Sequence, residues 1–94
     1  MVEKEKSRDI RRQIRHILMQ EWDPIGVNDI PEATDEYDGY IGDLYVLIER
    51  GATERELADY LRFVEIRQMG LSIPSTAARD QTASSLKKLA ALFA

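Results

Sequence analysis

Apolar residues recur at steps of three and four along most of the chain, which is the spacing that gives a helix one buried stripe. The first such stripe consists of Ile10, Ile14, Ile17 or Leu18, and Trp22. No stretch alternates apolar and polar residues for more than a few positions, so the pattern does not favour strands. It predicts four helices, at about residues 4–22, 35–50, 54–69 and 75–93.

Local signals mark where these helices begin and end. Pro24 stops the first helix, because the residue before a proline disfavours the helical region. Gly51 stands in the usual stop position of the second, and Thr53 to Glu56 fits the capping box that starts the third. The short link between them predicts a central antiparallel hairpin of helices. The fold class is therefore all-α, a compact four-helix bundle-like single domain over residues 1–94.

Charge is unevenly distributed between the first two helices. Residues 21–49 contain nine acidic residues and neither Lys nor Arg, whereas Arg8, Arg11, Arg12 and Arg15 crowd the first helix. Asp35, Glu36 and Asp38 fall in the predicted first turn of the second helix, where they would match the positive end of its dipole. The acids either face a basic partner or pair with the arginine helix, within one chain or across a homodimer.

Composition narrows the class of protein. The 94 residues include no cysteine, and the formal net charge is −4. The longest apolar runs fall far short of the roughly 20 residues that a membrane span needs. We expect a cytoplasmic protein that binds no membrane and no nucleic acid. Thr53 to Ala58 matches the T-x-x-E-L-A of a helix-turn-helix, but the predicted helix continues past it through residues 62–67.

The spacing of ionisable residues does not favour catalysis or metal binding. Glu36 and Asp43 are two helical turns apart and could share a face, yet no Glu-x-x-His step accompanies them. The single histidine, His16, has no candidate nucleophile beside it. We therefore predict no catalytic residue, no metal and no cofactor. A small carboxylate-based enzyme remains an alternative, provided that burial raises the pKa of one acid.

Two glycines inside the predicted second helix require an explanation. Gly39 and Gly42 each cost roughly 1 kcal/mol relative to alanine in a helix interior. We expect another helix, or the loop that begins at Trp22, to pack closely against them. The alternative is that a partner's chain approaches at this point.

The segment WDPIGV makes a rigid corner after the first helix. Trp22 is expected to fill the core, and Asp23 to accept hydrogen bonds from backbone N–H groups of the following loop. WDPIGV followed by DEYDGYI resembles a pattern, WDPxG…DEYDxY, of small, largely uncharacterised bacterial helical proteins, over about residues 10–71. The matching residues are Trp22, Asp23, Pro24, Gly26, Asp35, Tyr37 and Asp38. The resemblance implies a shared scaffold or surface and no known reaction.

We predict a non-enzymatic protein-interaction module, of the inhibitor or immunity type, whose acidic surface meets a basic partner protein. The expected surface comprises Trp22, Asp23, Asp35, Glu36, Tyr37, Asp38 and Tyr40. The tyrosines would serve as anchors. The alternative is a self-associating structural protein whose basic first helix pairs with the acidic second helix.

Overall fold

The computed structural model describes residues 3–71 and 76–93, and these residues are helices and turns without strands. The four main helices are α1 (Lys4–Ile17), α2 (Ile41–Glu49), α3 (Glu54–Phe63) and α4 (Thr76–Lys88). Three of them continue into a turn of different pitch. These turns are the π-helices η1 (Leu18–Trp22) and η4 (Val64–Gln68), and the 3₁₀ helix η5 (Leu89–Phe93). The predicted all-α, four-helix bundle-like fold is confirmed.

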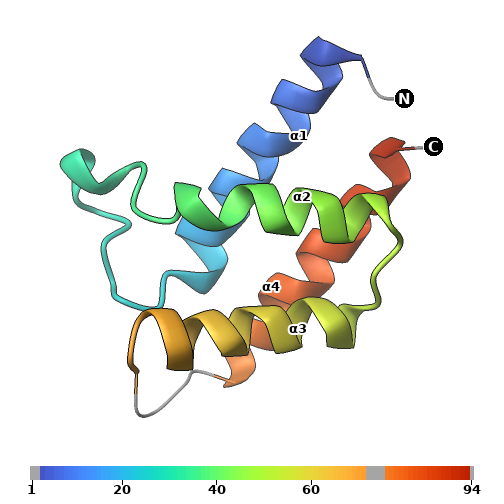
Figure 1. Cartoon of the computed structure of the whole chain (residues 1–94). Helices are drawn as coiled ribbons and strands as arrows, with labels where there is room; N and C mark the ends of the chain where they lie inside the picture. The colour runs from blue at the N-terminus through green and yellow to red at the C-terminus, as the bar shows by residue number, and fades with distance from the viewer. Residues whose placement is uncertain (1–2, 72–75, 94) are drawn as a thin grey trace.

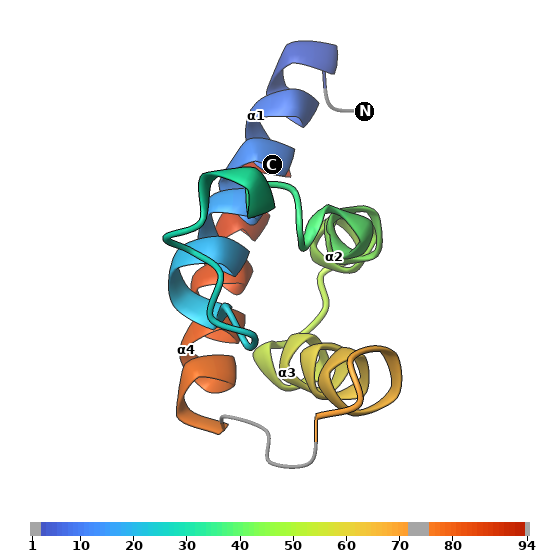
Figure 2. The same ribbon diagram turned by 90° about the vertical axis from the view of Figure 1, so that its left-hand side faces the viewer.

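The helices form two layers. α1 and α4 run in opposite directions in one layer, and α2 and α3 run in opposite directions in the other (Figures 1 and 2). The second layer crosses the first steeply, so that α2 packs mainly on α1 and α3 mainly on α4. The predicted short hairpin of α2 and α3 is present. However, α2 contacts α1, and α3 contacts α4, more extensively than α2 and α3 contact each other.

The core lies where the apolar stripes of the two layers meet. Ile10, Ile14 and Leu18 of the first helix and its π-turn are fully buried, as are Leu57 and Leu61 of α3. Stripes at three- and four-residue spacing place these side chains on one face, and burying each of them contributes roughly 1.5–3 kcal/mol. The hydrophobic effect therefore decides which faces of the helices turn inward.

The start of α3 follows the sequence signal closely. Thr53 Oγ1 accepts a hydrogen bond from the Glu56 N–H at 3.1 Å, and Glu56 Oε1 accepts one from the Thr53 N–H at 3.0 Å. These bonds to Thr53 hold the pKa of Glu56 below its ordinary value. The predicted capping box is confirmed.

The start of the second helix was predicted too early. α2 begins at Ile41, and residues 34–37 form turns that lead into the 3₁₀ helix η3 (Asp38–Tyr40). Tyr37 is 2% exposed with φ −101° and ψ 9°, so the chain turns its side chain into the core instead of continuing a helix. Asp35, Glu36 and Asp38 consequently lie outside the first turn of α2, where only Asp43 is acidic. The predicted fourth helix started at residue 75, which lies outside the described residues.

The prediction that Gly39 and Gly42 allow close internal packing is wrong. A Cβ atom placed on either glycine would meet no atom within 4 Å. Both residues are exposed. Among the described residues, therefore, neither a helix nor the loop after Trp22 needs these positions to lack a side chain.

This openness predicts that Gly42→Ala stabilises the protein. Gly42 has helical geometry in α2, so alanine should raise the free energy of unfolding by roughly 0.5–1 kcal/mol. Gly51→Ala is the matched control: at φ +82° it should lower that free energy by roughly 1–2 kcal/mol. Urea denaturation followed by circular dichroism measures both. A loss of stability in Gly42→Ala would show that something packs there.

Candidate functional site

Asp23 organises the corner that follows η1. It adopts the left-handed conformation (φ 33°, ψ 58°), the only non-glycine residue in the described ranges with positive φ. Its Oδ1 accepts a hydrogen bond from the Val27 N–H at 2.8 Å, and its Oδ2 accepts one from the Asn28 N–H at 3.1 Å. The predicted role of Asp23 is confirmed. The bonds offset the strain of the left-handed backbone and shape the loop after it.

Tyr37 connects the two sequence motifs. Its hydroxyl donates to Asp23 Oδ1 at 2.7 Å and accepts from the Ile25 N–H at 3.3 Å. Burial, together with the hydrogen bond to Asp23, raises the pKa of the Tyr37 hydroxyl well above its ordinary value of 10.0. The loop between Asp23 and Tyr37 is thereby closed at its base by side chains from both of its ends.

Trp22 lies at the centre of an aromatic cluster. Its ring centroid is 5.3 Å from that of Tyr37 and 6.1 Å from that of Tyr40, the latter edge-on. Such geometries contribute roughly 0.5–1.5 kcal/mol each beyond the area they bury. Trp22 is 4% exposed, which agrees with its predicted place in the core.

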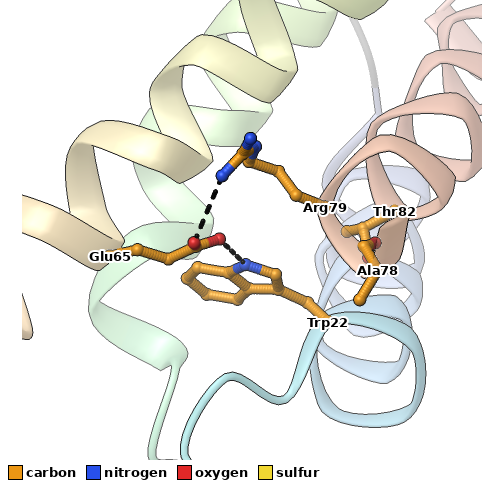
Figure 3. A network of polar contacts seen from close by, with 5 residues as sticks. All are labelled: Trp22, Glu65, Ala78, Arg79 and Thr82. Atoms are coloured by element: carbon orange, nitrogen blue, oxygen red, sulfur yellow. Dashed lines mark hydrogen bonds and ion pairs between the residues drawn. The ribbon is translucent and has the colours of Figure 1, made fainter. Parts of the chain in front are cut away.

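A buried carboxylate joins the tryptophan to the second half of the chain. Figure 3 shows Glu65 between Trp22 and Arg79, with the indole Nε1–H donating to Oε2 at 2.7 Å. The guanidinium of Arg79 donates to Oε1 at 3.4 Å. Glu65 is 1% exposed and Arg79 9%, so both charges are removed from water. Each carboxylate oxygen has a partner, which a buried charge requires.

This buried pair was missed in the sequence. A signal was available, because Glu65 follows Leu61 by four residues and so falls within the apolar stripe of the third helix. Trp22 and Glu65 also lie in the two π-helical turns, η1 and η4. A π-turn adds a residue and shifts the register of side chains, a shift that spacing alone does not reveal.

The structure separates the seven residues of the predicted interaction surface. Trp22 and Tyr37 lie in the core and offer no surface of their own, so for these two residues the prediction of an exposed anchor is corrected. Asp23 and Tyr40 are partly buried behind them. Asp35 and Glu36 are exposed. The acidic residues Asp35 and Glu36 of the predicted surface are therefore accessible, whereas its aromatic residues Trp22 and Tyr37 belong to the core.

Asp38 faces the arginine helix. Its two oxygens accept hydrogen bonds from Nε and Nη2 of Arg15, at 2.8 and 2.5 Å. The bond to Asp38 raises the pKa of the Arg15 guanidinium. Pairing of the arginine helix with the acidic stretch thus occurs inside one chain at this point.

The exposed part of the acidic stretch is the loop of residues 25–36, here called the acidic loop. It displays four exposed carboxylates and two large apolar side chains. The carboxylates are those of Asp29, Glu32, Asp35 and Glu36. Ile25 is 43% exposed and Ile30 45%. Within the described ranges, none of the four carboxylates belongs to an ion pair. The loop extends away from the helices in Figure 1.

The remaining ionisable side chains form no metal-binding cluster within the described residues. His16 lies exposed on α1. Among residues 3–71 and 76–93, no three His, Asp or Glu side chains lie close enough together to hold a metal ion. In the same part of the chain, no helix combines the length and the apolar character that crossing a membrane requires.

Comparison of the chain with family models, with curated proteins and with solved structures finds no match. The resemblance to WDPxG…DEYDxY proteins therefore stays a prediction. The structure explains what that pattern does in this chain. Trp22, Asp23 and Tyr37 bind one another or the core, so the pattern encodes a scaffold.

The buried pair predicts a strong dependence on Arg79. Arg79→Met leaves the Glu65 carboxylate buried without a counter-charge and should lower the free energy of unfolding by roughly 3–5 kcal/mol. Glu65→Gln combined with Arg79→Met should recover most of this loss, because the glutamine oxygen still accepts from Trp22. Urea denaturation of the two variants checks the pair. A double variant no more stable than Arg79→Met would contradict the proposed cause.

The Tyr37 hydroxyl predicts a loss of stability in alkali. Its folded-state pKa lies above the unfolded value, so its contribution is complete below about pH 10 and declines as the pH rises further. Tyr37→Phe should cost about 1–2 kcal/mol at neutral pH, and above about pH 10 its stability should fall less steeply than that of the wild type. Tyr60→Phe should flatten the profile in the same way, because burial and a hydrogen bond to Asp43 raise the pKa of the Tyr60 hydroxyl too. Parallel pH profiles for Tyr37→Phe and wild type would refute the assignment.

Proposed function

We propose that this protein is a non-enzymatic interaction module that binds a basic surface of another protein through its acidic loop. The observation that carries the proposal is the combination, on one anchored loop, of two exposed isoleucines with four exposed carboxylates that form no ion pair in the part of the chain that the structure describes. This connection contains only one short 3₁₀ helix, η2 (Pro31–Ala33), and long connections with so little regular structure are usually functional or disordered. This loop is tied at its base, which favours function.

Charge and apolar area have different roles in such a surface. Four like charges that form no ion pair within the described residues attract a basic partner and raise the rate of encounter. Ile25 and Ile30 supply the apolar contact that holds the complex once it has formed. Internal pairing does not account for these acids, since the ion pair to the arginine helix uses Asp38 alone.

Anchoring lowers the free-energy cost of binding. Asp23 and Tyr37 hold the loop from both ends, so fewer conformations are lost when a partner docks. This arrangement suits an inhibitor or immunity protein, which covers a basic active site with a preformed acidic surface. We place this activity in the cytoplasm, as the composition predicts, and in a bacterium, as the resemblance to WDPxG…DEYDxY proteins implies; it requires no cofactor or metal.

The proposal is tested by affinity capture from the host's lysate at low and high salt. The variant Glu32→Lys, Asp35→Lys, Glu36→Lys reverses the charge of the acidic loop without touching the Arg15–Asp38 pair. The matched control, Glu49→Lys, Asp59→Lys, Asp80→Lys, makes the same change in charge at exposed helix positions. We expect a basic protein held by wild type and control at low salt and lost by the loop variant.

Two outcomes would contradict the proposal. Equal capture by the wild type and the loop variant would exclude the acidic loop as the binding surface. The second outcome is that the wild-type protein captures further copies of its own chain. If sedimentation then shows dimers of the wild type but not of the loop variant, the result favours the self-associating structural protein. Circular dichroism of all three proteins confirms that the substitutions leave the fold intact.

A further inference from the structure

The arginines of α1 line a groove beside the start of α2. Arg8, Arg11, Arg12 and Arg15 are spaced so that all four lie on neighbouring turns of one helix face. Together with Asp38, Ile41 and Gly42 they enclose a depression of about 400 Å³ between α1 and the start of α2. The groove is thus basic along one wall, whereas the other wall combines Asp38 and Ile41 with the backbone of Gly42.

Internal contacts use only part of the positive charge in this groove. Arg15 binds Asp38, and Arg11 lies over the ring of Tyr45 at 4.3 Å from its centroid. Arg12 is 3.7 Å from Asp9 in an exposed pair, which water screens strongly. Arg8 forms no ion pair within the described residues. Guanidinium N–H donors therefore remain available along the groove.

Gly42 leaves the opposite wall open. Gly42 is the second residue of α2, where alanine favours the helix more than glycine does, and a Cβ atom placed on it would meet no atom of the described residues within 4 Å. Any longer side chain at this position would project into the space that the four arginines border. A glycine at such a place suits the close approach of a backbone from another molecule.

We infer that this groove binds an acidic segment of a protein partner in extended conformation. Arginines on successive helical turns are about 5–6 Å apart, and side chains at alternate positions of an extended strand are about 6–7 Å apart. An acidic residue at every second position therefore matches the arginine spacing. Guanidinium groups bind carboxylates through paired hydrogen bonds. Asp38, at the edge of the groove, offers oxygens to the segment's backbone N–H groups.

The charge around the groove favours a short peptide over a nucleic acid. The chain carries a net charge of −4, and exposed Asp9 and Asp35 lie on the elements that flank the groove. A long polyanion would meet these acids, whereas a segment of a few residues would meet the arginines alone. A phosphodiester backbone also has no N–H group to donate to Asp38.

The experiment is an NMR titration of the ¹⁵N-labelled protein with an octapeptide of alternating glutamate and glycine. Shifts of the Gly42 amide and of the arginine Nε–H signals report binding at the groove. We expect saturable shifts whose Kd rises at least tenfold in Gly42→Gln and in Arg8→Gln, Arg12→Gln. Arg50→Gln, Arg55→Gln removes the same charge from exposed positions elsewhere and should change Kd less than twofold.

Three results would overturn the inference. One is the absence of saturable shifts at the groove with the glutamate peptide. Another is equal or tighter binding of inorganic phosphate or of a single-stranded octanucleotide, which would make the groove a general anion or nucleic-acid site. The third is concentration-dependent shifts of the same signals without peptide, which would identify a second copy of the chain as the occupant. The first two results do not depend on the acidic loop, so they test the inference separately from the proposed function.

Discussion

The hydrogen bond between the Trp22 indole and the buried Glu65 carboxylate is the contact on which the arrangement of the helices depends. A carboxylate at 1% exposure is tolerated only while both of its oxygens are bound, and the second oxygen is bound by Arg79. The three residues come from the end of the first helix, the end of the third and the start of the fourth, so satisfying one charge positions three elements (Figure 3). The hydrophobic core supplies most of the stability, whereas this polar contact specifies one way of packing it. Ser85, whose hydroxyl donates to Glu21 at 2.6 Å, adds a second tie between α4 and η1.

A second polar contact, between Asp23 and Tyr37, lies at the corner that follows Trp22. Asp23, next to Trp22, closes the acidic loop through Tyr37, whose ring packs on the tryptophan. The loop's geometry is therefore coupled to the core. The most distinctive residues of the WDPIGV and DEYDGYI segments were predicted to form a surface. Most of them instead hold this corner together. The surface itself consists of the less distinctive positions between them, such as Asp29, Ile30 and Glu32.

The distribution of charge gives the molecule two charged faces of opposite sign that adjoin at the Arg15–Asp38 pair. The acidic loop extends from the corner, and the arginine groove lies along α1; Asp38 and Arg15 meet between them. That ion pair neutralises one charge of each kind and leaves the rest exposed. The two faces would select partners of opposite charge, one through carboxylates beside isoleucines and the other through guanidinium groups beside an open glycine.

The sequence by itself determined the all-α class, the inward faces of the helices, the capping box at Thr53 and the role of Asp23, because each depends on residues a few positions apart. Only the tertiary structure decided that Tyr37 is buried and delays the start of α2, that Gly42 borders open space, and that Glu65 pairs with Trp22 and Arg79. These outcomes rest on partners 14 to 43 residues away in the chain. Helical periodicity reports which side of a helix is apolar, but not which distant polar group will meet a carboxylate on that side. The local backbone preferences therefore set the elements, and the need to satisfy buried polar groups set how they were joined.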